Sequence, residues 1–315
     1  MKTVHEPSHE SGARAFTIIE LLVVVSIVGL ISSVVLGNLT QARQRAVTAS
    51  ARQFEASVRS AIGDRLVGSW NFNNDVGNTA VDDSGNNLNG TISNASYAIP
   101  GVDGTGSAIY FSGSNSYVSG TGAPVGDNIP VTVSAWIAPM DNSNARTIFL
   151  TGNGACKNYA VGINSSLLAI SNNLLTIGID PGAGQTSQAP GGASQLAAAQ
   201  LASDSGELAQ AQQIQNNEWT HIATAFNTDG TVTTYINGKF ARTISGLPTT
   251  DCGGPGNWSI GAVAVGAGVT EPFIGKIDNV AVYSGSITAM EASELYADGV
   301  AEFKLARNEA SQDSQ

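Results

Sequence analysis

The sequence is poor in cysteine, in histidine and in charged residues, and each shortage removes a class of function. Its 315 residues include two cysteines, too few for a four-thiolate zinc site or a cysteine-bound iron–sulfur cluster. Charged residues make up 12% of the chain, the formal net charge is −11, and no group of lysine or arginine residues is interleaved with aromatic residues. Such a chain repels phosphate backbones, so we expect no nucleic-acid binding by the folded domain.

The longest apolar segment runs from residue 16 to residue 36. Every residue in it is apolar, glycine, serine or threonine except Glu20. As an α-helix it spans about 31 Å, which matches the apolar core of a bilayer and predicts a transmembrane helix. Basic residues in the polar stretch before it favour a cytoplasmic N-terminus, so we expect the rest of the chain outside the inner (cytoplasmic) membrane. Apolar residues at helical spacing extend the predicted helix to residue 65.

Glu20 needs an explanation, because a carboxylate within lipid costs about 2.5 to 3.5 kcal/mol unless a partner charge offsets it. The segment from Ala15 to Val25 reads AFTIIELLVVV and closely resembles the prepilin cleavage and methylation motif of type IV pilins and pseudopilins. The resemblance implies a leader peptide over residues 1–15, cleavage after Ala15 by a prepilin peptidase, and methylation of Phe16. It also implies an ion pair from Glu20 to the Phe16 amine of a neighbouring subunit. Ala15 stands where most members have glycine, and a plain signal anchor is the alternative.

From about residue 66 short apolar runs alternate with polar residues and are separated by Gly, Asn and Asp, which is typical of β-strands. Asp229-Gly230 and Asn237-Gly238 predict two tight hairpins. Strands are expected at residues 67–72, 108–111, 131–137, 147–150, 159–163, 174–179, 219–227, 231–236, 239–244, 258–262 and 273–283. So many strands without intervening helices favour a two-sheet jelly-roll sandwich. The predicted fold class is α+β, a long N-terminal helix followed by an all-β sandwich.

Six short segments follow one another in the β-region: GSWNF (68–72), DDSGNNLNGT (82–91), VTVSAWI (131–137), WTHIA (219–223), YINGK (235–239) and IDNVAVY (277–283). In this order they resemble laminin-G-like domains, which have the concanavalin A-like fold. The resemblance implies one sandwich over residues 66–299, with a closing helix that Thr288 and Glu291 are spaced to cap. Residues 180–217 depart from the family as an insertion, and residues 300–315 are expected to form a polar tail.

The sequence carries few residues suited to chemistry. No pair of carboxylates suited to glycoside hydrolysis stands in the strands, and His221 alternates with its neighbours as a packed strand residue does, so we expect no enzyme activity. Asp83, Asn87, Asn89 and Asp278 occupy positions where relatives often bind Ca²⁺, and a calcium site and a cluster of Asx turns are both open. Cys156 and Cys252 lie in polar loops of an exported domain, which favours a disulfide. The tryptophans are expected in the core.

These features predict a type IV pilin-like subunit, a minor pilin, that polymerises through its N-terminal helix and displays the sandwich on an extracellular pilus or the cell surface. The expected partners are the prepilin peptidase, other pilin subunits, the inner membrane before assembly, and a glycan or protein ligand. The alternatives are a pseudopilin of a type II secretion or DNA-uptake machine, a membrane-anchored carbohydrate-binding module that never polymerises, and a degraded glycosidase. Fold alone does not decide among them.

Overall fold

The computed structural model describes residues 17–73, 77–102, 104, 106–122, 124, 130–141, 146–153, 156–163, 175–178, 214–245, 256–264 and 268–312. Within these ranges the side chains of residues 33–42, 175–178, 301–312 and several single positions lie outside the described part. The chain forms two units that divide between Ser57 and Val58, and each unit is described by itself.

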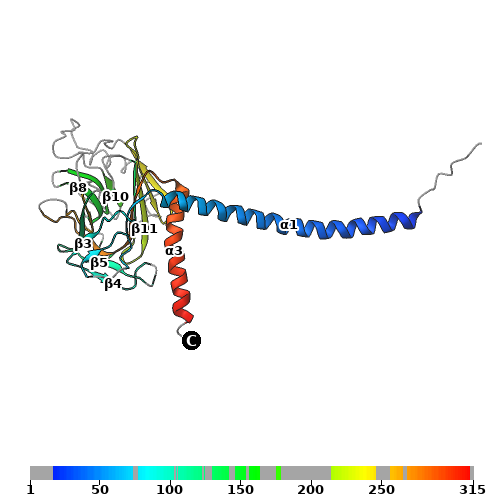
Figure 1. Cartoon of the computed structure of the whole chain (residues 1–315), viewed down its shortest axis with the longest axis horizontal. Coiled ribbons are helices and arrows are strands. Elements are labelled where there is room, and N and C mark those ends of the chain that lie inside the picture. The colour runs from blue at the N-terminus through cyan, green and yellow to red at the C-terminus, as the bar shows by residue number, and fades with distance from the viewer. Residues whose placement is uncertain are drawn as a thin grey trace, which may run out of the picture. The chain divides into compact units, whose positions relative to one another are not determined.

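The first unit is built around helix α1 (Ile18–Gly63), whose last turns belong to the second unit. Figure 1 shows α1 as one continuous helix. Its large apolar side chains between Ile18 and Ile31 are 47–82% exposed. Apolar surface of this extent is normally covered by lipid or by protein. That α1 works as a pilin helix stays a prediction.

Within the residues that the structure describes, no helix combines the length and the apolar character needed to cross a membrane. Phe16, where the predicted span at residues 16–36 begins, lies outside the described residues. The side chains at its end, from residue 33 on, also lie outside the described part. The transmembrane helix therefore stays a prediction.

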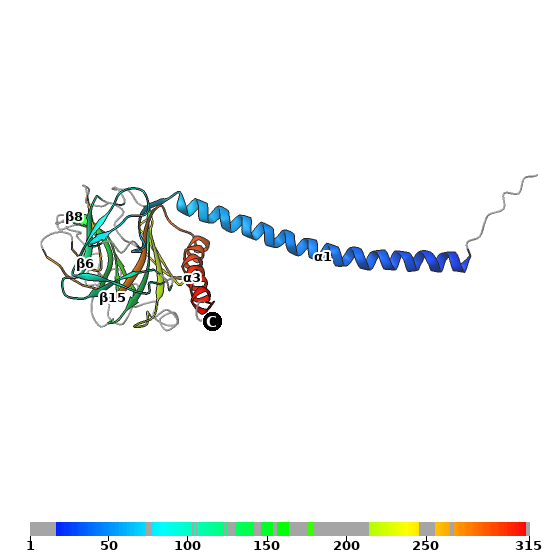
Figure 2. The ribbon, with the colours of Figure 1, turned by 60° about the horizontal axis from the view of Figure 1, so that its bottom comes forward.

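The second unit contains two antiparallel sheets stacked face to face, as Figures 1 and 2 show. The strands are β1 (Leu66–Trp70), β2 (Thr79–Ala80), β3 (Gly90–Ser93), β4 (Ala95–Ala98), β5 (Ala108–Ser112), β6 (Tyr117–Thr121), β7 (Val131–Pro139), β8 (Arg146–Asn153), β9 (Cys156–Ile163), β10 (Leu175–Gly178), β11 (Thr220–Phe226), β12 (Val232–Ile236), β13 (Lys239–Ile244), β14 (Asn257–Ile260) and β15 (Ile274–Ser284). Sheet A has the order β13-β12-β11-β7-β15-β5-β4, and β1 also pairs with β15. Sheet B has the order β10-β9-β8-β14-β6-β3-β2. This confirms the predicted jelly-roll sandwich.

Aromatic residues from both sheets fill the core between them. Trp70 lies 4.3 Å from Trp258 and 6.3 Å from Phe149 between ring centroids, and Tyr159 lies 5.2 Å from Phe226. All five side chains are at most 2% exposed, and each contributes roughly 1.5 to 3 kcal/mol by burial. Trp136 is buried as well, but on the outer face of sheet A, and Trp219 is only half-buried. The prediction that every tryptophan lies in the core is therefore wrong for Trp219.

Helix α3 (Ala289–Gln312) covers the outer face of sheet A, which explains why every residue of β7 and β11 is buried. Tyr296 stacks on Trp136 with 5.5 Å between ring centroids. A Cβ atom on Gly299 would lie 2.5 Å from Trp136 Nε1, so only glycine allows this close approach. The predicted cap of α3 is confirmed, since Thr288 N–H donates to Glu291 Oε2 at 2.7 Å and Glu291 N–H donates to Thr288 Oγ1 at 3.3 Å.

All the predicted strands occur, but the sequence did not reveal β2, β3, β4 and β6. These strands are short, and β3 and β6 each bury a single large apolar side chain, Ile92 and Val118, so alternation is hard to recognise. Both hairpin predictions are confirmed, with φ of 75° at Gly230, and 49° and 72° at Asn237 and Gly238. Helix α3 runs on to Gln312, past residue 300 where a polar tail was expected to begin. The insertion lies outside the described residues except for 214–217.

Candidate functional site

Glu20 caps the start of α1. The N–H and the hydroxyl of Thr17 both donate to Glu20 Oε2 at 2.9 Å, and Glu20 N–H donates to Thr17 Oγ1 at 3.3 Å. This reciprocal arrangement is a capping box, whose signature is the spacing Thr-Ile-Ile-Glu. Glu20 thus has a role within its own chain besides the predicted intersubunit one. An ion pair with a neighbouring subunit therefore competes with a partner within the same chain. Ala15 and Phe16, the predicted processing positions, lie outside the described residues.

Asp82 organises the loop between β2 and β3. Its Oδ1 accepts the N–H groups of Ser69 at 2.9 Å and Ser84 at 3.0 Å, and its Oδ2 accepts Leu88 N–H and Ser84 Oγ–H, both at 2.9 Å. Burial alone would raise the pKa of Asp82, but these hydrogen bonds together lower it. Asp82 N–H in turn donates to Asn89 Oδ1 at 2.8 Å. The carboxylate is thus stabilised as an anion by the chain itself.

The residues predicted to bind calcium come from the loop between β2 and β3 and from strand β15. Asp83, Asn87 and Asn89 are exposed beside Asp82. Asp278 is 2% exposed on β15, where its Oδ2 accepts Val102 N–H at 2.7 Å and its Oδ1 accepts Asn279 N–H at 2.8 Å. Among the described residues no group of three or more His, Cys, Asp or Glu residues is placed to hold a metal ion. The Asp82 cluster matches the Asx-turn alternative, and calcium binding stays a prediction.

His221 is a packed strand residue, as the alternation predicted. It is 1% exposed on β11, under α3, with its ring centroid 5.2 Å from Trp136 and 6.1 Å from Tyr296. Its Nε2 lies 2.9 Å from Ser134 Oγ, while Nδ1 is buried without a hydrogen-bond partner in the described part of the chain. Burial lowers the pKa of His221 to about 3. No carboxylate among the described residues accepts a hydrogen bond from His221 Nδ1, and α3 covers the ring, which differs from the arrangement of a nucleophilic catalytic pair.

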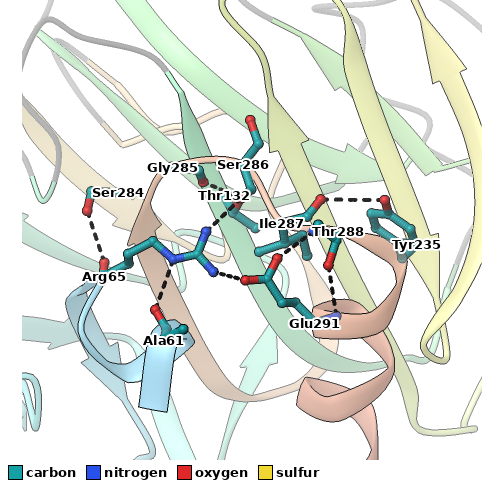
Figure 3. A network of polar contacts seen from close by, with 10 residues as sticks. All are labelled: Ala61, Arg65, Thr132, Tyr235, Ser284, Gly285, Ser286, Ile287, Thr288 and Glu291. Atoms are coloured by element: carbon teal, nitrogen blue, oxygen red, sulfur yellow. Dashed lines mark hydrogen bonds and ion pairs between the residues drawn. The ribbon is translucent and has the colours of Figure 1, made fainter. Parts of the chain in front are cut away.

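A polar network joins the end of α1 to α3 and β15, as Figure 3 shows. Arg65 Nη1 donates to Ser286 O at 2.7 Å, its Nε donates to Ala61 O at 3.1 Å, and its Nη2 forms an ion pair with Glu291. Ser284 N–H donates to Arg65 O at 2.8 Å. Six residues earlier, Arg59 pairs with Glu294 and Asp298 on α3. The last turns of α1 are therefore fixed to the sandwich, a connection that no local sequence pattern predicts.

The structure does not test the predicted disulfide between Cys156 and Cys252. Strand β9 begins at Cys156, but the Cys156 side chain and the whole of Cys252 lie outside the described residues. The disulfide stays a prediction.

Solved structures share this fold. Domain 4 of AbnA, an extracellular GH43 arabinanase from Geobacillus stearothermophilus, solved with arabinotriose, aligns with a TM-score of 0.51 at 22% identity over 74% of this chain and 98% of that one. The binding domain of Paraclostridial mosquitocidal protein 1 aligns with a TM-score of 0.51 at 20% identity. The ligand-binding domain of botulinum neurotoxin serotype D, solved with N-acetylneuraminic acid, aligns with a TM-score of 0.51 at 14% identity. These alignments cover 75% and 76% of this chain but 52% of each toxin chain, so the chain spans about half of their length.

No curated protein matches the chain. A family model for the concanavalin A-like lectin/glucanases superfamily matches residues 112–293. The match runs from the end of β5 into α3, includes most of both sheets, and contains the four later laminin-G-like motifs but not those at 68–72 and 82–91. The chain belongs to the concanavalin A-like lectin/glucanases superfamily.

Proposed function

We propose that the chain is a type IV pilin-like subunit, a minor pilin, that is held in the inner membrane by α1, then assembles through α1 and displays a non-catalytic concanavalin A-like domain on a pilus or cell surface. The observation that carries the assembly role is the exposed apolar surface of α1 between Ile18 and Ile31, with Glu20 as its one charged residue. Packing such helices together buries this surface, and a freed Phe16 amine offsets the Glu20 charge.

The proposed ligand is a glycan or a protein on another surface. The fold supports this role, because it is shared with the AbnA domain solved with arabinotriose and the neurotoxin domain solved with N-acetylneuraminic acid. The buried Ser134–His221 pair, which has no access for a substrate, supports a binding domain over an enzyme. A membrane-anchored carbohydrate-binding module that never polymerises shares this support and is the second candidate.

Two substitutions separate the charge of Glu20 from its capping role. Glu20→Gln removes the charge but keeps the capping box, because glutamine also accepts the Thr17 N–H. Thr17→Ala removes the hydroxyl but keeps the charge. We expect Glu20→Gln to reach the membrane normally and to lose incorporation into filaments, while Thr17→Ala still assembles. Immunogold labelling of surface filaments with antibody to the sandwich measures this. Normal filament yield from Glu20→Gln contradicts an assembly role for the charge.

The processing route has its own test. Intact-mass and N-terminal analysis of exported protein should find a chain that starts at N-methylated Phe16. A mature chain that still begins at Met1, on unassembled molecules, contradicts the pilin assignment and favours the anchored binding module. Filaments confined to a secretion or DNA-uptake apparatus, with none on the surface, favour the pseudopilin alternative.

A further inference from the structure

Three neighbouring strands place polar side chains in one row on the inner face of sheet A. Thr224 on β11 stands opposite Thr234 on β12, which stands opposite Arg242 on β13. Residues directly opposite each other share a face of the sheet. Thr224 also stands opposite Val133, a residue of the main core, so the row faces the space between the sheets.

The polar groups of this row are buried. Oγ1 of Thr224, Oγ1 of Thr234 and both terminal nitrogens of Arg242 are buried, and within the described part of the chain none of them has a hydrogen-bond partner. Burial lowers the pKa of Arg242 to about 10, so the guanidinium still carries its charge at neutral pH. A buried cation without an acceptor destabilises a fold, and a ligand that supplies an acceptor removes this cost.

The row ends at the rim of the sandwich. Strand β13 is one edge strand of sheet A, and β10 is an edge strand of sheet B. The contact between Tyr159 on β9 and Phe226 on β11 places β9 against β11, so both edges lie on the same side of the sandwich. Arg242 is partly exposed as a residue, although its terminal nitrogens are buried. Part of Arg242 therefore lies at the surface of this edge strand.

We propose that Arg242, with Thr234 beside it, binds the carboxylate of an acidic saccharide at this edge of the sandwich. A guanidinium recognises a carboxylate through two parallel N–H···O bonds, and the threonine hydroxyl supplies a further donor. The net charge of −11 repels anions from the chain as a whole, so the fixed Arg242 cation is the group that favours an anionic ligand at this position. This inference rests on the proposed recognition role of the sandwich but not on filament assembly.

The test uses the full chain in detergent at constant ionic strength, with glucuronate, glucose and sulfate as probes in calorimetric titration and thermal unfolding. We expect glucuronate to bind and to raise Tm, glucose to have no effect, and Arg242→Gln to weaken glucuronate binding at least about tenfold. Lys239→Gln is the matched control, because it removes one positive charge from an exposed position of the same strand. An unchanged response of Arg242→Gln, or no response to glucuronate, overturns the site. Equal binding of sulfate and glucuronate overturns the saccharide assignment.

Arg242→Met separates a ligand-binding role from a structural one. Without ligand we expect this variant to have a higher Tm than the wild type, because an unpaired buried charge is removed, and to lose the glucuronate response. A lower Tm with the glucuronate response intact refutes the proposal. Filament labelling of Arg242→Gln in cells keeps the two proposals distinguishable. If the chain binds glucuronate through Arg242 but never forms filaments, the saccharide site is supported and the assembly role is contradicted. If filaments form normally but glucuronate does not bind, the assembly role is supported and the saccharide site is contradicted.

Discussion

Acid should destabilise the sandwich through His221. In the folded chain this imidazole is buried under α3 and its pKa is lowered to about 3, whereas a histidine in an unfolded chain has a pKa of about 6.5. The neutral ring is therefore tolerated above pH 6.5, and stability is lost as the pH falls from 6.5 towards 3, because only the unfolded chain takes up the proton. The loss is about 1.4 kcal/mol per pH unit, or about 2 kcal/mol between pH 7.5 and pH 5.

Urea denaturation at pH 7.5, 6 and 5, followed by tryptophan fluorescence, measures this loss. All four tryptophans lie at or beyond residue 70, so the signal reports the sandwich, and the other histidines, His5 and His9, precede it. His221→Gln cannot titrate, so it should lower stability at pH 7.5 but flatten the dependence between pH 7.5 and 5. The slope, rather than absolute stability, is the readout, which separates titration from lost packing. An equally steep slope in His221→Gln refutes the reasoning.

Further predictions concern the helix contact and the loop. Gly299→Val should cost about 1 to 3 kcal/mol of unfolding free energy, because the larger side chain pushes α3 off sheet A. Gly63→Ala is the control: nothing lies within 4 Å of its new Cβ, so it should change the unfolding free energy by less than about 1 kcal/mol. Equal effects of the two substitutions in urea denaturation contradict the packing argument. Asp82→Asn should cost about 2 kcal/mol and Asp83→Asn much less, by thermal unfolding. Calorimetric titration with Ca²⁺ should show heat that Asp83→Asn reduces, and no heat with the wild-type chain rejects the calcium site.

The parts of the fold that the sequence predicted are those where one pattern decides the structure. Alternating runs in β7 and β11, the two hairpin turns, and the Thr288–Glu291 cap each follow from local spacing. Strands such as β3 were missed because their position depends on pairing partners far along the chain rather than on their own residues.

The candidate sites were less predictable, because they depend on which loops and strands meet. Asp82, rather than Asp83, turned inward to hold the loop, and nothing in two adjacent aspartates distinguishes them before the fold is known. Arg242 was not predicted as an inward-facing residue, because a β-bulge in β13 interrupts the alternation of inward and outward side chains along the strand. Only the cross-strand register reveals that its side chain faces the core.

The contacts of Arg65 with β15, Ser286 and Glu291 have a mechanical consequence for a domain that is held at one end. Leu66 and the rest of β1 form a ladder with β15, and the Arg65 guanidinium holds Ser286 and Glu291 beside it. Tension that arrives along α1 is thus divided between a strand ladder and a side-chain clamp before it strains the interior. If the chain acts as the proposed surface subunit, a domain attached in this way stays folded while force is applied through α1.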